Sequence, residues 1–178
     1  ELTWHKEQTG QADPGARRLH ASRAWKDGVL MFGGVQGAQL LADTWQWTKR
    51  QGWSLTVTDG PTARAAHALT TTVDPGTLLL FGGTTAEGDA QDAWLWTGSW
   101  RALCEPGTTC KTPPARSGHA MVFDAERKRV VLVGGASSGV ALEDTWEWSL
   151  ETGWNKRCGT PQADAAESRP PCGFGARF

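Results

Sequence analysis

The hydrophobic and polar positions of the chain form a pattern that occurs three times. Apolar runs at 29–32, 78–81 and 130–133 are each followed by Gly-Gly. Because every position in these runs is apolar, each predicts a strand buried on both faces, near the centre of the molecule. Long stretches with the apolar spacing of an amphipathic helix are absent from the sequence. The pattern therefore predicts an all-β chain.

Tryptophan-bearing segments follow each apolar run at a constant distance. An Asp-x-Trp-x-Trp segment occupies 43–47, 92–96 and 144–148, and a single Trp comes a few residues later each time. Two Trp side chains two positions apart in a strand project from the same face, where they can pack on a neighbouring sheet. An aromatic platform for sugars is the alternative, but repetition in every unit favours packing.

A Pro-x-Ala-Arg-x-x-His segment completes each unit, at 14–20, 61–67 and 113–119. The Gly-Gly pairs recur at steps of 49 and 52 residues, and the other features keep the same order. We therefore divide residues 1–178 into repeat units of about 14–60, 61–112 and 113–169. Partial units stand at both ends, because Trp4 fits the series of single tryptophans and residues 170–178 resemble the start of another Pro-x-Ala-Arg segment.

These features together resemble the kelch repeat, and more specifically its bacterial secreted branch and the galactose-oxidase-like repeats. The resemblance covers nearly the whole chain. It implies a β-propeller of four-stranded blades, of which about three are present as a partial ring or arc. Since propellers close with 4 to 8 blades, the remainder of a longer chain, a second copy of this chain or another protein is expected to complete or cap the arc.

The residues that recur in every unit are expected to be structural. The glycines allow close backbone approach or positive φ, and the tryptophans pack between blades. These residues are Gly33, Gly34, Gly82, Gly83, Gly134, Gly135, Trp45, Trp94, Trp146, Trp53, Trp100 and Trp154. The recurring arginines and aspartates are expected to join turns or blades through charge-assisted hydrogen bonds; they are Arg17, Arg64, Arg116, Asp43, Asp92 and Asp144.

A histidine also recurs in each unit, at His20, His67 and His119. Histidine is chemically versatile, so a catalytic or metal-binding role is one interpretation. One copy per unit without a carboxylate at a fixed spacing favours a packed histidine bonded to a neighbouring loop. We expect no metal site.

The four cysteines form two local pairs in Pro-, Gly- and Thr-rich connections. Neither pair has CxxC spacing or a nearby histidine, so disulfides Cys104–Cys110 and Cys158–Cys172 are favoured over zinc ligation. Disulfides form in oxidising compartments. The chain is therefore expected to be extracellular, periplasmic or displayed on a cell surface.

Charge and hydropathy restrict the partners. The 18 Lys and Arg residues nearly balance the 19 Asp and Glu residues, so no strong field attracts nucleic acid. No apolar run is long enough to cross a membrane, and the first residues lack the features of a signal peptide. A protein or a glycan is the expected partner, with self-association as a further possibility.

Catalytic motifs are not found. The chain contains no tyrosine, so the tyrosine-dependent copper-radical chemistry of galactose oxidase cannot be carried by these residues. No GxSxG, GxGxxG or GK[ST] context occurs either. We expect no catalytic residue, no cofactor and a binding or scaffolding function, the alternatives being the propeller part of a secreted enzyme whose site lies elsewhere, or a structural subunit of a surface assembly.

The candidate binding surface follows from the loops. Strand direction alternates within a blade, so the long loops at 35–42, 84–91 and 136–143 emerge on one face. Binding residues tend to lie on long loops that a rigid scaffold supports. The candidates are polar residues that differ between the units: Gln36, Gln39, Glu87, Asp89, Gln91, Ser137, Ser138 and Glu143.

Overall fold

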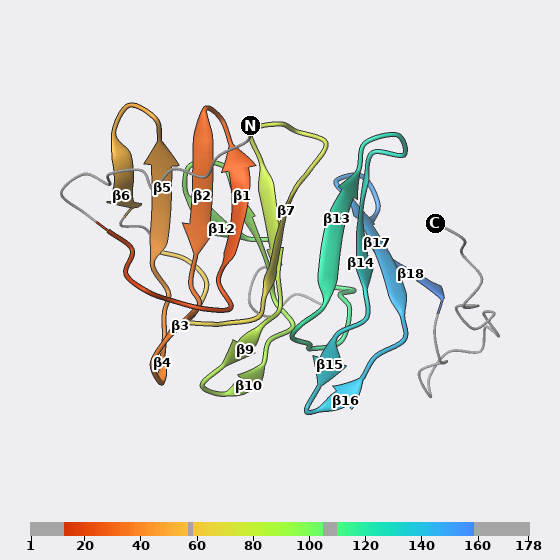
Figure 1. Cartoon of the computed structure of the whole chain (residues 1–178). Coiled ribbons are helices and arrows are strands. Elements are labelled where there is room, and N and C mark those ends of the chain that lie inside the picture. The colour runs from red at the N-terminus through yellow and green to blue at the C-terminus, as the bar shows by residue number, and fades with distance from the viewer. Residues whose placement is uncertain (1–12, 57–58, 105–109, 159–178) are drawn as a thin grey trace, which may run out of the picture.

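The computed structural model of the chain describes residues 13–56, 59–104 and 110–158. Within these residues the regular structure is entirely β. Three antiparallel four-stranded sheets follow one another along the chain, and each forms one blade of an arc (Figure 1). The predicted all-β propeller arc of three blades is confirmed, and these three blades do not close into a ring.

The blades have the same strand order from one sheet edge to the other. Blade 1 consists of β1 (Ala21–Trp25), β2 (Gly28–Phe32), β5 (Thr44–Thr48) and β6 (Gly52–Thr56). Blade 2 consists of β7 (Ala68–Thr71), β8 (Leu78–Phe81), β11 (Ala93–Trp96) and β12 (Trp100–Ala102). Blade 3 consists of β13 (Ala120–Asp124), β14 (Arg129–Val133), β17 (Thr145–Ser149) and β18 (Gly153–Cys158).

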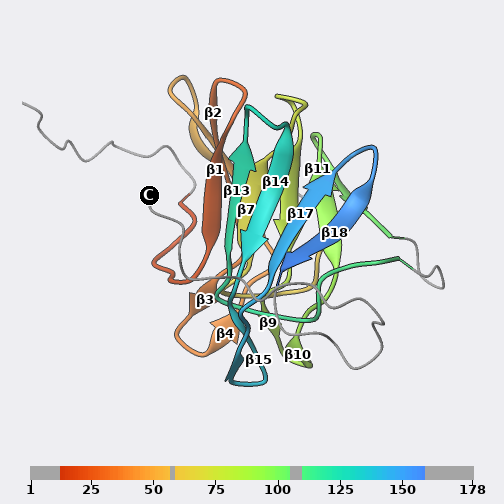
Figure 2. The same ribbon diagram turned by 90° about the vertical axis from the view of Figure 1, so that its right-hand side faces the viewer.

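A two-stranded hairpin is inserted between the second and third strands of every blade. The hairpin strands are β3 (Val35–Gln36), β4 (Gln39–Leu40), β9 (Thr84–Thr85), β10 (Gly88–Asp89), β15 (Ala136–Ser137) and β16 (Val140–Ala141). All three hairpins extend from the same end of their blades, while the short turns lie at the opposite end of the blades (Figures 1 and 2). The predicted long loops thus emerge on one face.

The first strands β1, β7 and β13 lie innermost in the arc, where β7 contacts both β1 and β13. The apolar runs form β2, β8 and β14, which are second from the inside. The runs therefore lie near the centre, as expected, with one strand of each blade further in. The second strand of blade 2 is paired along both edges and covered by a blade on each face, so it is uniformly apolar; all four residues of β8 are buried.

Aromatic side chains pack the blades together. Phe32 of blade 1 packs edge-on against Trp100 of blade 2, with ring centroids 5.1 Å apart. Phe81 and Trp154 make the corresponding contact between blades 2 and 3, at 5.2 Å. Both contacts join the second strand of one blade to the fourth strand of the next, so Trp100 and Trp154 lie in the interfaces between blades.

Two of the recurring arginines, Arg64 and Arg116, link their blade to the one before it. The backbone of Arg64 bonds to blade 1, accepting from Gly34 N at 2.9 Å and donating to Leu41 O at 3.0 Å. Its side chain bonds to blade 2, where Nη1 donates to Gly82 O and both terminal nitrogens contact the Asp92 carboxylate. One residue therefore joins two blades, as predicted for this arginine.

The same ion pair occurs in all three units. Arg17 pairs with Asp43 and Arg116 with Asp144, each through two hydrogen bonds. The aspartate also accepts a hydrogen bond from the indole N–H of the tryptophan two residues later. In blade 3, Trp146 Nε1 donates to Asp144 Oδ2 at 2.7 Å. Burial alone would raise the pKa of Asp144, but Arg116 and Trp146 outweigh it and hold the pKa below its usual range. The carboxylate is therefore charged at neutral pH.

Candidate functional site

The three hairpins place the predicted binding residues on the face of the arc where the hairpins extend from the blades, here called the hairpin face (Figure 1). Gln36 and Gln39 are cross-strand partners in the first hairpin. Glu87 and Asp89 belong to the second, and Ser137 and Ser138 to the third. Gln91 and Glu143 lie beyond the hairpins, on the segments that return to β11 and β17.

The structure joins the second and third hairpins directly. The backbone N–H of Ser138 donates to Asp89 Oδ2 at 2.8 Å, and Thr84 Oγ1 donates to the other carboxylate oxygen at 3.0 Å. Burial alone would raise the pKa of Asp89, but these donors and Ser117 lower it. Asp89 thus joins the second hairpin to the third.

The remaining candidates stay more open. Gln91 Nε2 donates to Thr112 Oγ1 at 3.1 Å, which ties it to the segment before blade 3. Gln36, Gln39, Glu87 and Glu143 are exposed. The structure therefore gathers the predicted residues on one face, and it makes Asp89 part of the support for that face.

The recurring histidines approach one another at the inner strands. His20, His67 and His119 line a concavity of about 370 Å³ beside β1, β7 and β13. His67 packs edge-on against Phe32, and His119 against Phe81, which confirms the predicted packing. The ring nitrogens of these two histidines have no hydrogen-bond partner within the described structure, so the predicted bond to a loop is not observed.

Burial controls the charge of the inner histidines. Burial, with the Arg64 guanidinium second, lowers the pKa of His67 to about 3. Burial and Arg116 lower the pKa of His119 to about 4. Both imidazoles are therefore neutral near pH 7 and take up a proton only at much lower pH. Their arrangement fits packing between blades, and no group of three or more potential metal ligands is found in the described residues.

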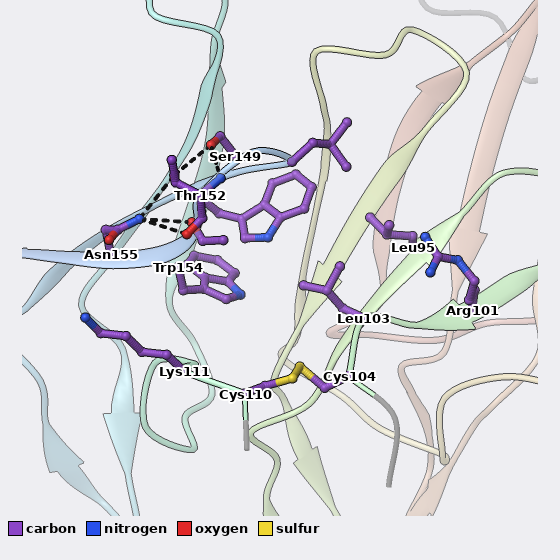
Figure 3. A pocket seen from close by; sticks show the side chains of 13 residues that line it. Leu95, Arg101, Leu103, Cys104, Cys110, Lys111, Ser149, Thr152, Trp154 and Asn155 are labelled. Atoms are coloured by element: carbon purple, nitrogen blue, oxygen red, sulfur yellow. Dashed lines mark hydrogen bonds between the residues drawn. A yellow bond between two sulfur atoms is a disulfide. The ribbon is translucent and has the colours of Figure 1, made fainter. Parts of the chain in front are cut away.

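A second concave surface, here called the rim groove, lies between the outer strands of blades 2 and 3 (Figure 3). Its volume is about 450 Å³. Blade 2 contributes β11 and β12, and blade 3 contributes the turn from β17 to β18. Its lining consists of Leu95, Arg101, Leu103, Cys104, Cys110, Lys111, Trp148, Ser149, Leu150, Thr152, Gly153, Trp154 and Asn155.

One wall of the rim groove is the turn between β17 and β18. Ser149 and Thr152 share a hydrogen bond between their hydroxyls at 2.8 Å, and Asn155 Nδ2 donates to Thr152 O, Thr152 Oγ1 and Gly153 O (Figure 3). The opposite wall contains the Cys104–Cys110 disulfide, with Lys111 beside it. Both walls are therefore fixed by bonds within the protein.

The sequence interpretation did not include this groove. Arg101 and Lys111 do not recur between units, and the lining comes from separate blades and a disulfide-closed connection. A comparison of the repeat units does contain one difference that points to this groove. Arg101 follows the single Trp of its unit, where the other units have Ser54 and Asn155.

The predicted disulfides differ in what the structure describes. Cys104 and Cys110 are bonded, with their Cα atoms 6.1 Å apart. Cys158 ends β18, and its predicted partner Cys172 lies outside the described residues.

Trp4 and the segment 170–178, predicted to belong to further repeats, lie outside the described residues as well. Among described residues, no helix has the length and apolar character needed to cross a membrane.

The fold and the repeated contacts define a protein with kelch-like repeats arranged as a propeller arc. No family model matches the chain. It is 32% identical over 147 residues to an F-box/kelch-repeat protein of Arabidopsis thaliana, an alignment that covers 75% of this chain and 30% of that protein. This similarity supports the kelch-like repeats, while the bacterial secreted branch stays a prediction.

Two other relatives are similar over comparable lengths. The chain is 28% identical over 142 residues to tRNA wybutosine-synthesizing protein 4 of Aspergillus fumigatus, covering 76% of this chain and 13% of that protein. It is 30% identical over 149 residues to human multiple epidermal growth factor-like domains protein 8, covering 75% of this chain and 5% of that protein. The chain thus spans less than a third of each relative it matches.

Proposed function

We propose that the chain is a protein-interaction module and that its partner binds the hairpin face. The carrying observation is a contrast within each unit. The residues that recur are engaged in packing or in ion pairs, whereas the hairpin tips differ in sequence and are mostly exposed. A rigid scaffold with variable exposed loops is the arrangement that specific recognition uses. The kelch-repeat relative supports a protein as the partner.

A protein partner fits the hairpin face better than a glycan does. Sugar sites commonly use an exposed aromatic ring on which the sugar packs, and residues 35–40, 84–89 and 136–141 contain no aromatic residue. Amide, carboxylate and hydroxyl groups provide donors and acceptors for a polypeptide backbone. A glycan that binds this face with higher affinity than any protein would contradict the proposal.

The test combines a partner screen with two sets of variants. Proteins from the natural source are screened for direct binding, and each binder is retested against Gln39→Arg, Glu87→Arg and Ser138→Arg combined. We expect affinity to fall about tenfold or more, because large charged side chains obstruct the contact. The matched set Lys49→Glu, Thr97→Arg and Glu126→Arg changes the turns at the opposite end and should leave binding unchanged. The reverse result would remove the hairpin face as the site.

We further propose that the module works in an oxidising compartment. The Cys104–Cys110 disulfide supports this, because such bonds persist outside reducing compartments. The test is the mass of the protein isolated from its natural source with alkylation of free thiols. Alkylated Cys104 and Cys110 in the native protein would contradict the proposal.

A further inference from the structure

We propose that the rim groove is a second binding site, separate from the hairpin face, and that it binds an acidic protein segment in which an apolar side chain lies beside carboxylates. The groove is formed by the outer strands and by the turn between β17 and β18, whereas the hairpins extend from the other end of the blades. The two sites can therefore be tested independently.

The positive charge of the rim groove favours a negatively charged ligand. Arg101 and Lys111 line it and are exposed, and no Asp or Glu is among the lining residues. Neither cation has a hydrogen-bond or ion-pair partner in the described structure, although the other arginines that face blade interfaces do. Two unpaired cations beside one concavity favour an anionic partner.

The floor of the groove selects an apolar side chain. Leu103, which is half-buried, comes from blade 2, and Leu150, which is 56% exposed, comes from the turn of blade 3. Leu95 of blade 2 also lines the groove but is only 2% exposed. Trp148 and Trp154 complete the floor but are each only 3% exposed. Stacking on a sugar requires an open indole face, which these two residues do not offer. A buried aliphatic or aromatic side chain of a protein segment fits this floor better.

An unsatisfied donor is buried behind the same floor. Trp154 Nε1 is buried and has no hydrogen-bond partner, although Trp154 lies along the groove beside Leu103 (Figure 3). At the preceding interface the equivalent Trp100 Nε1 donates to Thr44 Oγ1 at 2.8 Å. Ala93 occupies the position of Thr44 in blade 2, so the protein supplies no acceptor there. Trp154 Nε1 is therefore a buried donor without an acceptor, a feature that distinguishes this interface from the preceding one.

The groove is specific to the interface between blades 2 and 3. At the interface between blades 1 and 2, Ser54 stands in place of Arg101. There, Gln46 Nε2 donates to Thr56 Oγ1 at 2.8 Å in place of the leucine pair. The walls of the rim groove are fixed by the disulfide and by the hydrogen bonds of the turn, so little ordering is required when a ligand binds.

The test uses the whole oxidised 178-residue chain and two sets of labelled octapeptides. In the first set, one Leu, Phe or Trp is flanked by Asp and Glu; in the second set, Asn and Gln replace the acids. Fluorescence anisotropy should show that acidic peptides bind about tenfold tighter or more, with affinity falling as salt rises. Binding should also shift the indole N–H proton resonance of Trp154, assigned with Trp154→Phe.

Matched variants locate the site. Arg101→Gln with Lys111→Gln should reduce the affinity for acidic peptides about tenfold, because both cations are removed. Lys49→Gln with Arg50→Gln removes two exposed cations from the corresponding turn of blade 1 and should leave affinity unchanged. The combined hairpin-face variant should also bind normally, which separates this proposal from the proposed function.

Three results would overturn the proposal. The first is equal binding, or none, of the acidic and amide peptides up to millimolar concentration. The second is unchanged affinity in the Arg101 and Lys111 double variant. The third is binding of a heparin hexasaccharide, tested in the same assay, without binding of any acidic peptide, which would assign the cations to a glycan.

Discussion

At the scale of single residues, the arginine–aspartate pairs carry the strongest contacts between loops and blades. Arg116 is completely buried, and the side chain of Asp144 is 9% exposed. The guanidinium spans Gly134 O and both carboxylate oxygens, which a lysine amine cannot match in geometry. Loss of either partner leaves a buried charge without compensation.

We therefore predict that Arg116→Met lowers the free energy of unfolding by about 3–5 kcal/mol, because Asp144 is left charged and buried. Urea unfolding followed by tryptophan fluorescence measures the change. Arg50→Met, at an exposed turn residue, is the control and should change the free energy of unfolding by less than about 0.5 kcal/mol. Equal effects of the two substitutions would show that the pair contributes little.

Thr44 offers a second residue-scale prediction. Its hydroxyl accepts from the buried Trp100 Nε1, and Val has nearly the same shape without the acceptor. Thr44→Val should lower the free energy of unfolding by about 1–3 kcal/mol, since a buried donor is left unsatisfied. Thr44→Ser keeps the hydroxyl and should retain the Trp100 indole resonance position. A wild-type resonance in Thr44→Val would contradict the assignment of this bond.

The inner histidines predict a dependence of stability on pH. Burial lowers the folded-state pKa values of His67 and His119 to about 3 and about 4, so the unfolded chain binds protons first as the pH falls below about 6.5. Stability is therefore full above this pH and decreases as the pH falls toward the folded-state values. Each site contributes a slope of about 1.4 kcal/mol per pH unit, or about 4 kcal/mol for both between pH 7 and pH 5.

Urea unfolding at pH 7, 6 and 5 measures this slope. His67→Gln and His119→Gln should each remove about half of it. His20→Gln changes the exposed member of the series and should remove less. The aspartates of the ion pairs act at lower pH, because their pKa values lie below the usual range. An unchanged slope in both buried-histidine variants would refute this explanation.

At the scale of elements, the segment that enters each blade approaches the second glycine of that blade's Gly-Gly pair closely. Gly83 has φ of 101°, and a Cβ there would lie 2.8 Å from Ala65 O and from His67 Cβ. Gly37, at the tip of the first hairpin, also has positive φ, but a Cβ there meets nothing within 4 Å. The two positions separate steric overlap from backbone strain.

We predict that Gly83→Ala destabilises the chain by about 3 kcal/mol or more, because both the positive φ and the overlap oppose the side chain. Gly37→Ala should cost about 1 kcal/mol, since only the backbone conformation opposes it. Thermal and urea unfolding of both variants provide the comparison. Similar losses would show that the approach between Gly83 and the segment entering blade 2 is less tight than in the structure.

The elements were predictable from sequence because repetition reinforced weak local signals. Each apolar run pairs with its tryptophan segment in the same register, with Met31 opposite Trp45, Leu80 opposite Trp94 and Leu132 opposite Trp146. The innermost strand was not predictable from the apolar runs. The strands that begin near His20, His67 and His119 border a concavity on one side, so they are less uniformly apolar than β8.

The sites divide in the same way. The hairpin face follows from strand alternation and loop length, which are readable from a repeat. The rim groove depends on Arg101 and Lys111, which lie on either side of a disulfide-closed connection, and on a turn of the next blade. Such a surface arises from packing between units, and no spacing within one unit encodes it.

At the scale of the whole molecule, the flank of the arc formed by blade 3 differs from the interfaces between the blades. Gly34 N and Gly83 N donate to the arginine carbonyls of the next blade, whereas Gly135 N in blade 3 has no such partner among the described residues. Val122 and Val133 on this flank are 60% and 49% exposed, although Phe32 and Phe81, equivalent to Val133, are completely buried. Within the described residues, this flank thus has the surface of a blade interface but no following blade.

Charge modifies this flank. Glu147 is buried at the position of Gln46 and Leu95, and it forms ion pairs with Arg127 and Arg157 at 2.7 Å. Arg129 lies 3.9 Å from the same carboxylate. The cluster therefore has more cations than anions, so a surface that covers it is expected to carry compensating acidic groups.

We predict that the 178-residue chain self-associates through this flank, because exposed apolar surface with unpaired backbone groups favours edge-to-edge contact. Light scattering across a concentration series under non-reducing conditions should show a mass that rises above 19.2 kDa. Val122→Lys with Val133→Lys should restore the monomer mass, since two more cations join the arginine cluster. Val73→Lys, at an exposed turn, should leave association unchanged. A monomer at all concentrations would mean that the flank is covered within the chain itself, whereas a single dimer would favour two arcs completing one ring.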